Sequence, residues 1–295
     1  MESKAELSRI IFPYVRVYKD GTIERLAGTG IAPAGLDPET GVLSKDTMII
    51  PETGVSARLY LPNSTKSNQK LPLVIYYHGG GFYLSSTADP YYHHSLNKIV
   101  SVANIILVSV NYRESTGRHE PWLIDYADYG KVFLAGDSCG ANMAHHFGLR
   151  IKDSELGREL KIEGIAMINP YLWGKDPVGV EVTDHQRKTM VDDWWMFVCP
   201  SEKGCDDPLI NPFMDGNSSS FEGLGCERLL VLVAEKDILR DRGRMYYEKL
   251  VKSGWPGTAK IIETKGEDHI FHIFDPNCEN AKALFKLLAS FFNQA

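Results

Sequence analysis

The amino-acid sequence predicts an α/β protein in which a mostly parallel central sheet carries helices on both faces. Near-continuous, β-branched apolar runs fit strands that are buried on both faces of a parallel sheet. Five such runs are present: 71–78, 104–112, 131–136, 162–170 and 228–235. Helix-forming stretches lie between several of these runs: 87–102, 139–152 and 240–253. This alternation is typical of the α/β class, and an amphipathic helix predicted over 279–295 would cover one face of the sheet.

The first third of the chain predicts antiparallel strands instead. The stretch YVRVYKDGTIERL contains two short strand patterns on either side of Lys19-Asp20-Gly21, which is a strong hairpin signal. Residues 55–62 alternate apolar and polar side chains, so we expect one more strand there, followed by a polar surface loop.

One long segment does not fit the alternation of strands and helices. Residues 171–227 lie between two strand runs and are rich in Trp, Pro, Gly and Asp. Their central cluster, Trp194-Trp195-Met196-Phe197, either lines a pocket or closes part of the core. A long insertion after a sheet strand is where a lid or cap usually lies.

Composition excludes several classes of function. The 295 residues are 43% hydrophobic and 24% charged, which suits a soluble globular protein of one large or two smaller domains. A net charge of −6 without a basic cluster argues against nucleic acid as a partner. No apolar run approaches the ~18 to 20 residues of a membrane span. The N-terminus shows no secretory signal and the five cysteines are scattered, so we expect a cytoplasmic protein with reduced thiols.

The sequence Gly136-Asp137-Ser138-Cys139-Gly140 stands where a strand run passes directly into a helix-forming stretch. A tight turn that needs only small residues would explain it. So would a nucleophile elbow, in which a strained turn lifts the serine hydroxyl clear of the sheet edge. A second motif, YYHGGGFY at 76–83, favours the elbow, because an HGGG loop upstream of G-x-S-x-G is the oxyanion-hole arrangement of lipase- and esterase-like hydrolases.

On this interpretation Ser138 is the nucleophile of an acyl-transfer site. The backbone N–H groups of Gly80, Gly81 and Cys139 would converge on the oxyanion of the tetrahedral intermediate. We expect Cys139 to contribute its backbone only, since the elbow lifts its central residue alone.

The serine needs an acid and a histidine later in the chain. Asp237 follows a buried strand run and should point into the crevice at the carboxyl ends of the strands, whereas Asp241 falls inside the next helix. His269 directly follows a Gly-Glu-Asp loop, whereas His272 lies deeper among apolar residues and fits a core histidine. We therefore predict Asp237 and His269 as the partners of Ser138.

A metal site is not expected. Three adjacent pairs could suggest one: His93-His94, His145-His146 and Asp206-Asp207. Adjacent side chains on a helix or strand point in different directions, so such pairs chelate poorly, and the chain has no HExxH or CxxC motif.

Several segments together resemble one known family, the plant carboxylesterases of the hormone-sensitive-lipase-like branch of the α/β-hydrolase fold. They are FPYVRVYKDGTIERL, DPETGVLSKD, YYHGGGFY, VSVNYR, PWLIDYADYGKVFLAGDSCGANMAHH, DPLINP, LLVLVAEKDILRDRG and GEDHIFHIF. The resemblance covers nearly the whole chain from about Phe12. It implies a Ser138, Asp237, His269 triad, an HGGG oxyanion loop and no cofactor. It also implies a single domain, 1–295, with a cap built from about 1–25 and about 171–227.

The resulting prediction is a serine carboxylesterase that hydrolyses a small carboxylic ester through an acyl-enzyme. The family that the chain resembles also contains 2-hydroxyisoflavanone dehydratases and gibberellin receptors. A dehydratase-like lyase, or a receptor that binds a small molecule without turning it over, therefore stay as alternatives. The receptors lack the triad histidine, and some dehydratases carry threonine in place of Ser138.

One stretch departs from the family pattern. After VNYR, residues 114–118 stand in for roughly two dozen residues that relatives carry before the Pro-Trp pair. The crossover to the next strand can still close, but it has no room for a full covering helix. We expect apolar surface to be exposed there, with poor folding or self-association, such as a homodimer, as the consequence.

Overall fold

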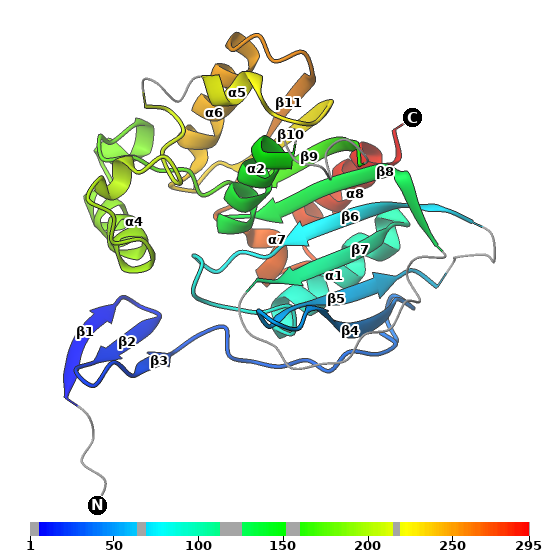
Figure 1. Cartoon of the computed structure of the whole chain (residues 1–295), viewed down its shortest axis with the longest axis horizontal. Helices are drawn as coiled ribbons and strands as arrows, with labels where there is room; N and C mark the ends of the chain where they lie inside the picture. The colour runs from blue at the N-terminus through cyan, green and yellow to red at the C-terminus, as the bar shows by residue number, and fades with distance from the viewer. Residues whose placement is uncertain (1–5, 64–68, 113–125, 152–159, 215–218, 295) are drawn as a thin grey trace, which may run out of the picture.

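An eight-stranded sheet forms the centre of the protein in a computed structural model, which describes residues 6–63, 69–112, 126–151, 160–214 and 219–294 (Figure 1). Its strands, in spatial order, are β11 (Thr258–Thr264), β10 (Arg228–Ala234), β9 (Ile162–Ile168), β8 (Ala127–Asp137), β6 (Leu71–Tyr77), β7 (Ile106–Asn111), β5 (Val55–Leu61) and β4 (Leu43–Ile50). The strands from β11 to β7 are parallel, and β5 and β4 join antiparallel. The predicted mostly parallel sheet is therefore confirmed.

Helices cover both faces of this sheet, as predicted (Figure 1). On one face, α1 (Pro90–Ala103) and α8 (Glu279–Asn293) pack against each other and share an apolar core with strand residues such as Phe133. On the other face, α2 (Cys139–Ile151) and α6 (Arg240–Lys252) enclose a second core with residues such as Leu134. Successive residues of one strand thus enter opposite cores, which explains the continuous apolar run that the sequence shows there.

The five predicted strand runs correspond to β6, β7, β8, β9 and β10. The sequence patterns do not predict the two edge strands, β4 and β11. Both carry polar or charged residues along a partly exposed face, LSKDTMII in β4 and TAKIIET in β11, so neither forms an apolar run. Edge strands are solvated on one side, and this weakens the hydrophobic signal on which the prediction depends.

The N-terminal hairpin lies apart from the central sheet. The strands β2 (Val15–Tyr18) and β3 (Ile23–Arg25) pair antiparallel on either side of the predicted turn. A further strand, β1 (Leu7–Ile11), pairs with β2 and completes a three-stranded sheet. This small sheet lies beside α4 (His185–Val198), where the Trp194 indole Nε1–H donates to the Phe12 carbonyl at 2.9 Å (Figure 1).

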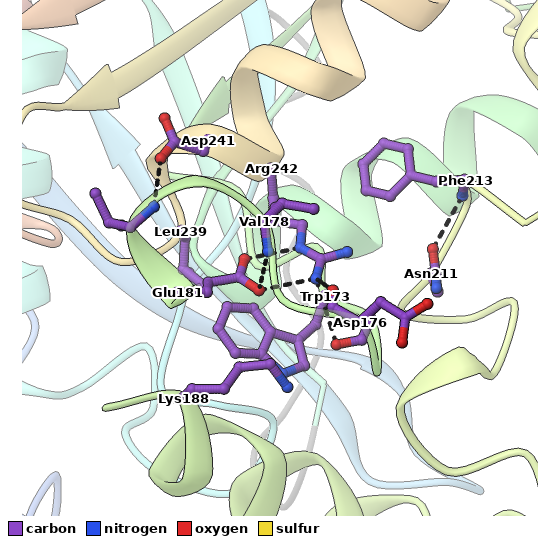
Figure 2. Close-up of polar contacts among 12 residues, drawn as sticks. Trp173, Asp176, Val178, Glu181, Lys188, Asn211, Phe213, Leu239, Asp241 and Arg242 are labelled. Atoms are coloured by element: carbon purple, nitrogen blue, oxygen red, sulfur yellow. Dashed lines mark hydrogen bonds and ion pairs between the residues drawn. The ribbon is translucent and has the colours of Figure 1, made fainter. Parts of the chain in front are cut away.

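The remainder of the insertion after β9 is mostly irregular. It contains two short 3₁₀ helices, η1 (Gly179–Val182) and η2 (Gly204–Asp206), and the short α-helix α5 (Ser219–Glu222). A buried ion pair attaches its beginning to α6: the Arg242 guanidinium contacts both carboxylate oxygens of Glu181 at 2.8 Å (Figure 2). Arg242 also donates to the Asp176 carbonyl and lies over the Trp173 ring, 5.5 Å from its centroid. The root of the insertion is therefore fixed to the sheet layer through α6.

The shortened crossover at 113–120 lies outside the described residues, so the exposed patch and the homodimer inferred from it stay predictions. The strand that follows begins at Ala127, four residues before the predicted start. Among the described helices, none combines the length and the hydropathy that a membrane crossing requires.

Candidate active site

Ser138 occupies the sharp turn between β8 and α2. Its φ of +54° is a left-handed conformation that residues other than glycine seldom adopt, so the turn is strained. The flanking glycines are required by close packing, because a Cβ on Gly140 would lie 1.9 Å from the Tyr77 carbonyl oxygen and one on Gly136 would lie 2.5 Å from Gly140 itself. The geometry is that of the predicted elbow.

The structure brings Ser138, His269 and Asp237 together from three distant parts of the chain. The His269 Nε2 atom lies 3.0 Å from the Ser138 hydroxyl oxygen. On the other side of the ring, Nδ1 lies 2.8 Å from a carboxylate oxygen of Asp237. A neutral imidazole with its proton on Nδ1 would donate to Asp237 and accept from Ser138, which is the arrangement needed to activate a serine.

The environment of His269 favours its protonated form. Burial alone would lower the pKa of the imidazole, but the charge and hydrogen bond of Asp237, with further charge from Asp137 and Asp268, raise the pKa above its ordinary value. His269 thus becomes a stronger base while it remains in hydrogen-bond contact with the serine.

Asp237 is held rigidly at the end of β10. Its side chain is 1% exposed, and the Asn169 amide donates to Oδ2 at 3.0 Å while the Leu239 backbone N–H donates to Oδ1 at 2.9 Å. These bonds keep the carboxylate aimed at His269. The role of Asn169 was not predicted, although its place at the carboxyl end of a predicted strand is a signal that could have identified it.

The glycine loop after β6 lines the same cavity as Ser138. Gly80 has φ +104° and Gly81 has φ +60°, and a Cβ on Gly80 would lie 2.3 Å from the Leu84 carbonyl oxygen. The Gly80 carbonyl accepts hydrogen bonds from the backbone N–H groups of Tyr83 and Leu84, which turns the loop tightly. Within the described residues, no hydrogen-bond acceptor is found for the Gly80 N–H.

Cys139 is completely buried at the start of α2, and its side chain does not line the cavity. Burial raises the pKa of this thiol to about 12, despite the backbone N–H of Phe82, which donates to Sγ at 3.2 Å. Such a thiol is not a nucleophile at neutral pH. The backbone N–H of Cys139 has no acceptor within the described part of the chain, as expected for the first residue of a helix.

A buried carboxylate that the sequence analysis did not single out joins the elbow to the glycine loop. Asp137 accepts hydrogen bonds from the Tyr76 hydroxyl at 2.7 Å, the Tyr92 hydroxyl at 2.6 Å and the Gly79 backbone N–H at 3.2 Å. Burial raises the pKa of Asp137 to about 6, and the hydrogen bonds from Tyr92 and Tyr76 oppose this rise. The residue before Ser138 therefore positions Gly79, the first glycine of the loop.

A cavity of about 520 Å³ opens above Ser138. Its walls are largely aromatic and aliphatic and come from the N-terminal hairpin region, α4, the glycine loop and α7 (Phe271–Phe274) with its preceding loop. The aromatic members are Tyr14, Tyr83, Tyr91, Tyr92, Tyr171, Trp194 and Phe274. Among the charged residues that line it, Arg187 on α4 and Asp268 beside His269 are the more exposed.

Asp241 and His272, which the sequence analysis weighed against Asp237 and His269, make other contacts. The Asp241 carboxylate pairs with Arg240 at 2.9 Å and accepts from the Val180 N–H at 3.0 Å, so it holds the insertion. His272 is fully buried on α7, and burial lowers its pKa to about 3. Neither residue lines the cavity.

The paired histidines and aspartates do not converge on a common point. His145 contacts the Tyr246 hydroxyl at 2.8 Å, while His146 contacts the Leu209 carbonyl at 2.8 Å. His93 likewise contacts the Tyr60 hydroxyl at 3.1 Å. The structure shows no group of three or more His, Cys, Asp or Glu within its described ranges that could hold a metal ion.

Comparison with known proteins identifies the family. A model of the alpha/beta hydrolase fold matches residues 74–273. "Probable carboxylesterase 2" of Arabidopsis thaliana is 54% identical over 100% of this chain and 99% of its own length. The "2-hydroxyisoflavanone dehydratase" of Glycyrrhiza echinata is 39% identical, with 97% and 96% covered. A solved Pyrobaculum calidifontis esterase superposes with a TM-score of 0.68 at 25% identity, with 84% of each chain covered.

The Arabidopsis comparison also bears on the length of the chain. It spans 314 aligned positions, whereas this chain has 295 residues, so at least 19 positions of the relative have no counterpart here. This difference is close in size to the shortening inferred after VNYR, but it does not locate the missing positions.

The likeness to the Arabidopsis relative extends over the whole chain. A family model covering residues 74–273 and a 54% identical relative of full length are each sufficient to assign the family. The chain belongs to the α/β-hydrolase family, in the group that contains the plant carboxylesterases.

Proposed function

We propose that this protein is a serine carboxylesterase that hydrolyses small carboxylic esters. The observation that carries the proposal is the continuous hydrogen-bonded line from the Ser138 hydroxyl through the His269 ring to the Asp237 carboxylate, with contacts of 3.0 and 2.8 Å. The carboxylesterase names of relatives, including the 54% identical Arabidopsis protein, support it.

In the proposed reaction the Ser138 oxygen attacks the ester carbonyl carbon, and His269 Nε2 takes the hydroxyl proton. The tetrahedral intermediate collapses when its bond to the alcohol oxygen breaks, and His269 returns the proton to the departing alcohol. In the second half-reaction His269 takes a proton from water, and the water oxygen attacks the acyl carbon. The bond to the Ser138 oxygen then breaks, His269 returns the proton to that oxygen, and the carboxylic acid leaves. Asp237 holds the imidazole in the correct tautomer and stabilises the imidazolium.

The oxyanion formed in each half-reaction would be held by backbone donors. We assign this role to the N–H groups of Gly80, Gly81 and Cys139, whose loop and helix start meet beside Ser138. Such donors matter because they face the charge that develops in the transition state, and losing one typically costs about 3 kcal/mol.

We propose a single hydrolase domain whose cap consists of the N-terminal hairpin and the insertion with α4. Tyr14 from the first element and Trp194 from the second both line the cavity above Ser138. Because the walls are mainly apolar, an ester with an apolar acyl or aryl group fits best.

Two other functions were open from the sequence. A receptor without turnover is disfavoured by the intact His269 and its contact with Ser138. A dehydratase-like lyase has support from the 39% identical Glycyrrhiza relative, but the relative with 54% identity carries the carboxylesterase name. We therefore keep the lyase as the second candidate.

A fluorophosphonate probe together with a panel of p-nitrophenyl esters tests the proposal. The folded protein should take up one probe per chain, which intact mass measures, and should hydrolyse short apolar esters. A folded protein that is neither labelled nor active on any ester would refute the esterase. Turnover of a 2-hydroxyisoflavanone far above that of the esters would establish the lyase instead.

The raised pKa of His269 predicts the pH dependence of the reaction. Protonated His269 cannot accept the serine proton, so the rate should fall as the pH drops through this pKa, with a midpoint above 6.5. Replacing the charge of Asp237 in Asp237→Asn should move the imidazole titration to lower pH, as followed by NMR of the His269 ring. An unchanged titration would show that Asp237 does not set this pKa.

A reducing compartment, with the cytoplasm as the simplest choice, is the proposed location. All five cysteines are free in the structure, which supports a reducing environment. Imaging of a fluorescent fusion in plant cells tests this, and exclusion of the fusion from the cytoplasm would overturn it.

A further inference from the structure

Arg187 connects the insertion to both loops that supply the partners of Ser138. It lies in the first turn of α4, where Asp184 caps the helix by accepting the Arg187 backbone N–H at 3.0 Å and fixes the guanidinium through Nε at 2.8 Å. The two remaining nitrogens of the guanidinium are thereby directed away from α4. They point toward the loops that follow β10 and β11.

One of these nitrogens contacts the loop that bears the histidine. Arg187 Nη1 lies 3.3 and 3.4 Å from the two carboxylate oxygens of Asp268. The same carboxylate accepts the backbone N–H of His269 at 2.8 Å. Arg187 therefore holds the carboxylate that orients the His269 backbone.

The other nitrogen contacts the turn that bears the acid. Arg187 Nη2 donates to the Lys236 carbonyl at 2.9 Å, one residue before Asp237. The Lys236 backbone N–H in turn donates to the Glu267 carbonyl at 2.8 Å. One side chain of the insertion is thus bonded to both loops, and it lines the same cavity as Ser138.

We propose that Arg187 is a positioning residue, which couples the seating of α4 over the cavity to the alignment of His269 and Asp237. The inference rests on the proposed ester hydrolysis, since it assigns no chemistry of its own to Arg187. A planar guanidinium can satisfy three acceptors in different directions at once, whereas a lysine ammonium is a single point charge on a flexible stem.

The expected signature is a loss of rate without a comparable loss of stability. Arg187 and Asp268 are 35% and 54% exposed, and ion pairs this exposed contribute little to folding. A small misalignment of reacting groups, in contrast, can reduce the rate by about 10²-fold. Arg187→Gln should therefore lower kcat by about 10- to 100-fold. Its KM and its melting temperature should remain close to those of the wild type.

Conservative variants separate positioning from charge alone. Arg187→Lys should recover only part of kcat, because it keeps the charge and loses the divided hydrogen bonds. Asp268→Asn should also lower kcat. In the double variant with Arg187→Gln, the fold-loss of kcat should be smaller than the product of the two single-variant losses, because both substitutions break the same chain of contacts.

Arg244→Gln provides the matched control. Arg244 lies on α6, is 45% exposed and pairs with Asp241 at 3.2 Å, but it does not line the cavity, so its replacement should leave kcat unchanged. If the wild type hydrolyses esters and Arg187→Gln keeps full kcat, the positioning role is wrong while the esterase stands. A change confined to KM would also overturn it, because that result assigns Arg187 to direct substrate binding. A wild type without ester turnover refutes the proposed function itself.

Discussion

Ser138→Ala should reduce ester turnover by at least about 10⁴-fold and abolish labelling by a fluorophosphonate probe. The reason is that removal of the hydroxyl leaves His269 with no proton to accept and the ester carbonyl with no attacking oxygen on the protein. A residual rate from oriented water and the oxyanion donors would remain. Stopped assays with p-nitrophenyl butyrate and intact-mass spectrometry after probe treatment measure the two effects.

The variant should fold normally, so its loss of activity can be assigned to chemistry. Alanine keeps the Cβ that strains the left-handed conformation, so the substitution adds no backbone clash, and the lost contact is to a ring that is 30% exposed. Its melting temperature should stay within about 2 °C of the wild type. Ser290→Ala on the exposed face of α8 serves as the control and should keep both activity and labelling. Ester turnover that survives in Ser138→Ala would exclude the acyl-serine.

Glu181→Gln should produce the largest loss of stability. The Glu181 and Arg242 side chains are 0% and 3% exposed, so the substitution leaves the arginine charge buried without its counter-ion (Figure 2). Breaking a buried pair from one side typically costs about 3 to 5 kcal/mol. For a chain of this size that corresponds to a fall in melting temperature of roughly 10 °C, which thermal and urea unfolding would detect.

An exposed ion pair provides the comparison for this prediction. Glu279→Gln on α8 removes a contact to Lys282 in which the side chains are 89% and 51% exposed, and it should change the free energy of unfolding by less than about 0.5 kcal/mol. Replacing both buried partners with apolar residues, in Glu181→Leu combined with Arg242→Met, should restore much of the stability. Equal unfolding free energies for Glu181→Gln and the wild type would contradict the stabilising role assigned to the Glu181–Arg242 ion pair.

Those parts of the site that follow a strand end could be predicted from the sequence. Ser138, Asp237 and the glycine loop each come directly after an apolar run, and the carboxyl ends of parallel strands share one edge of a sheet. His269 follows β11, a strand that the sequence did not predict. Its assignment depended on the Gly-Glu-Asp loop directly before it and on the chain order of serine, acid and histidine. The central strands could be predicted for the same reason that they are buried, namely their continuous apolar composition.

The supporting contacts could not be predicted, because they join positions whose proximity depends on strand order and on how the insertion packs. Asp137 meets Tyr76 because β8 and β6 are neighbours in the sheet although β7 lies between them in sequence, and 61 residues separate the two. Arg187 meets Asp268 across 81 residues, and only the placement of α4 brings them together. No local sequence pattern encodes a contact between residues that are so far apart in the chain.

In the proposed mechanism, the cluster around Asp137 joins the attacking oxygen of Ser138 and the glycine loop assigned as oxyanion donor into one hydrogen-bonded frame. A displacement of Gly79 would also act on Asp137, the residue before Ser138, because the Asp137 carboxylate accepts the Gly79 backbone N–H. Random substitution near the elbow should therefore yield mostly inactive proteins. Directed evolution of chain-length selectivity should instead accumulate changes in the hairpin and in α4, where the walls of the cavity can be reshaped without moving that frame.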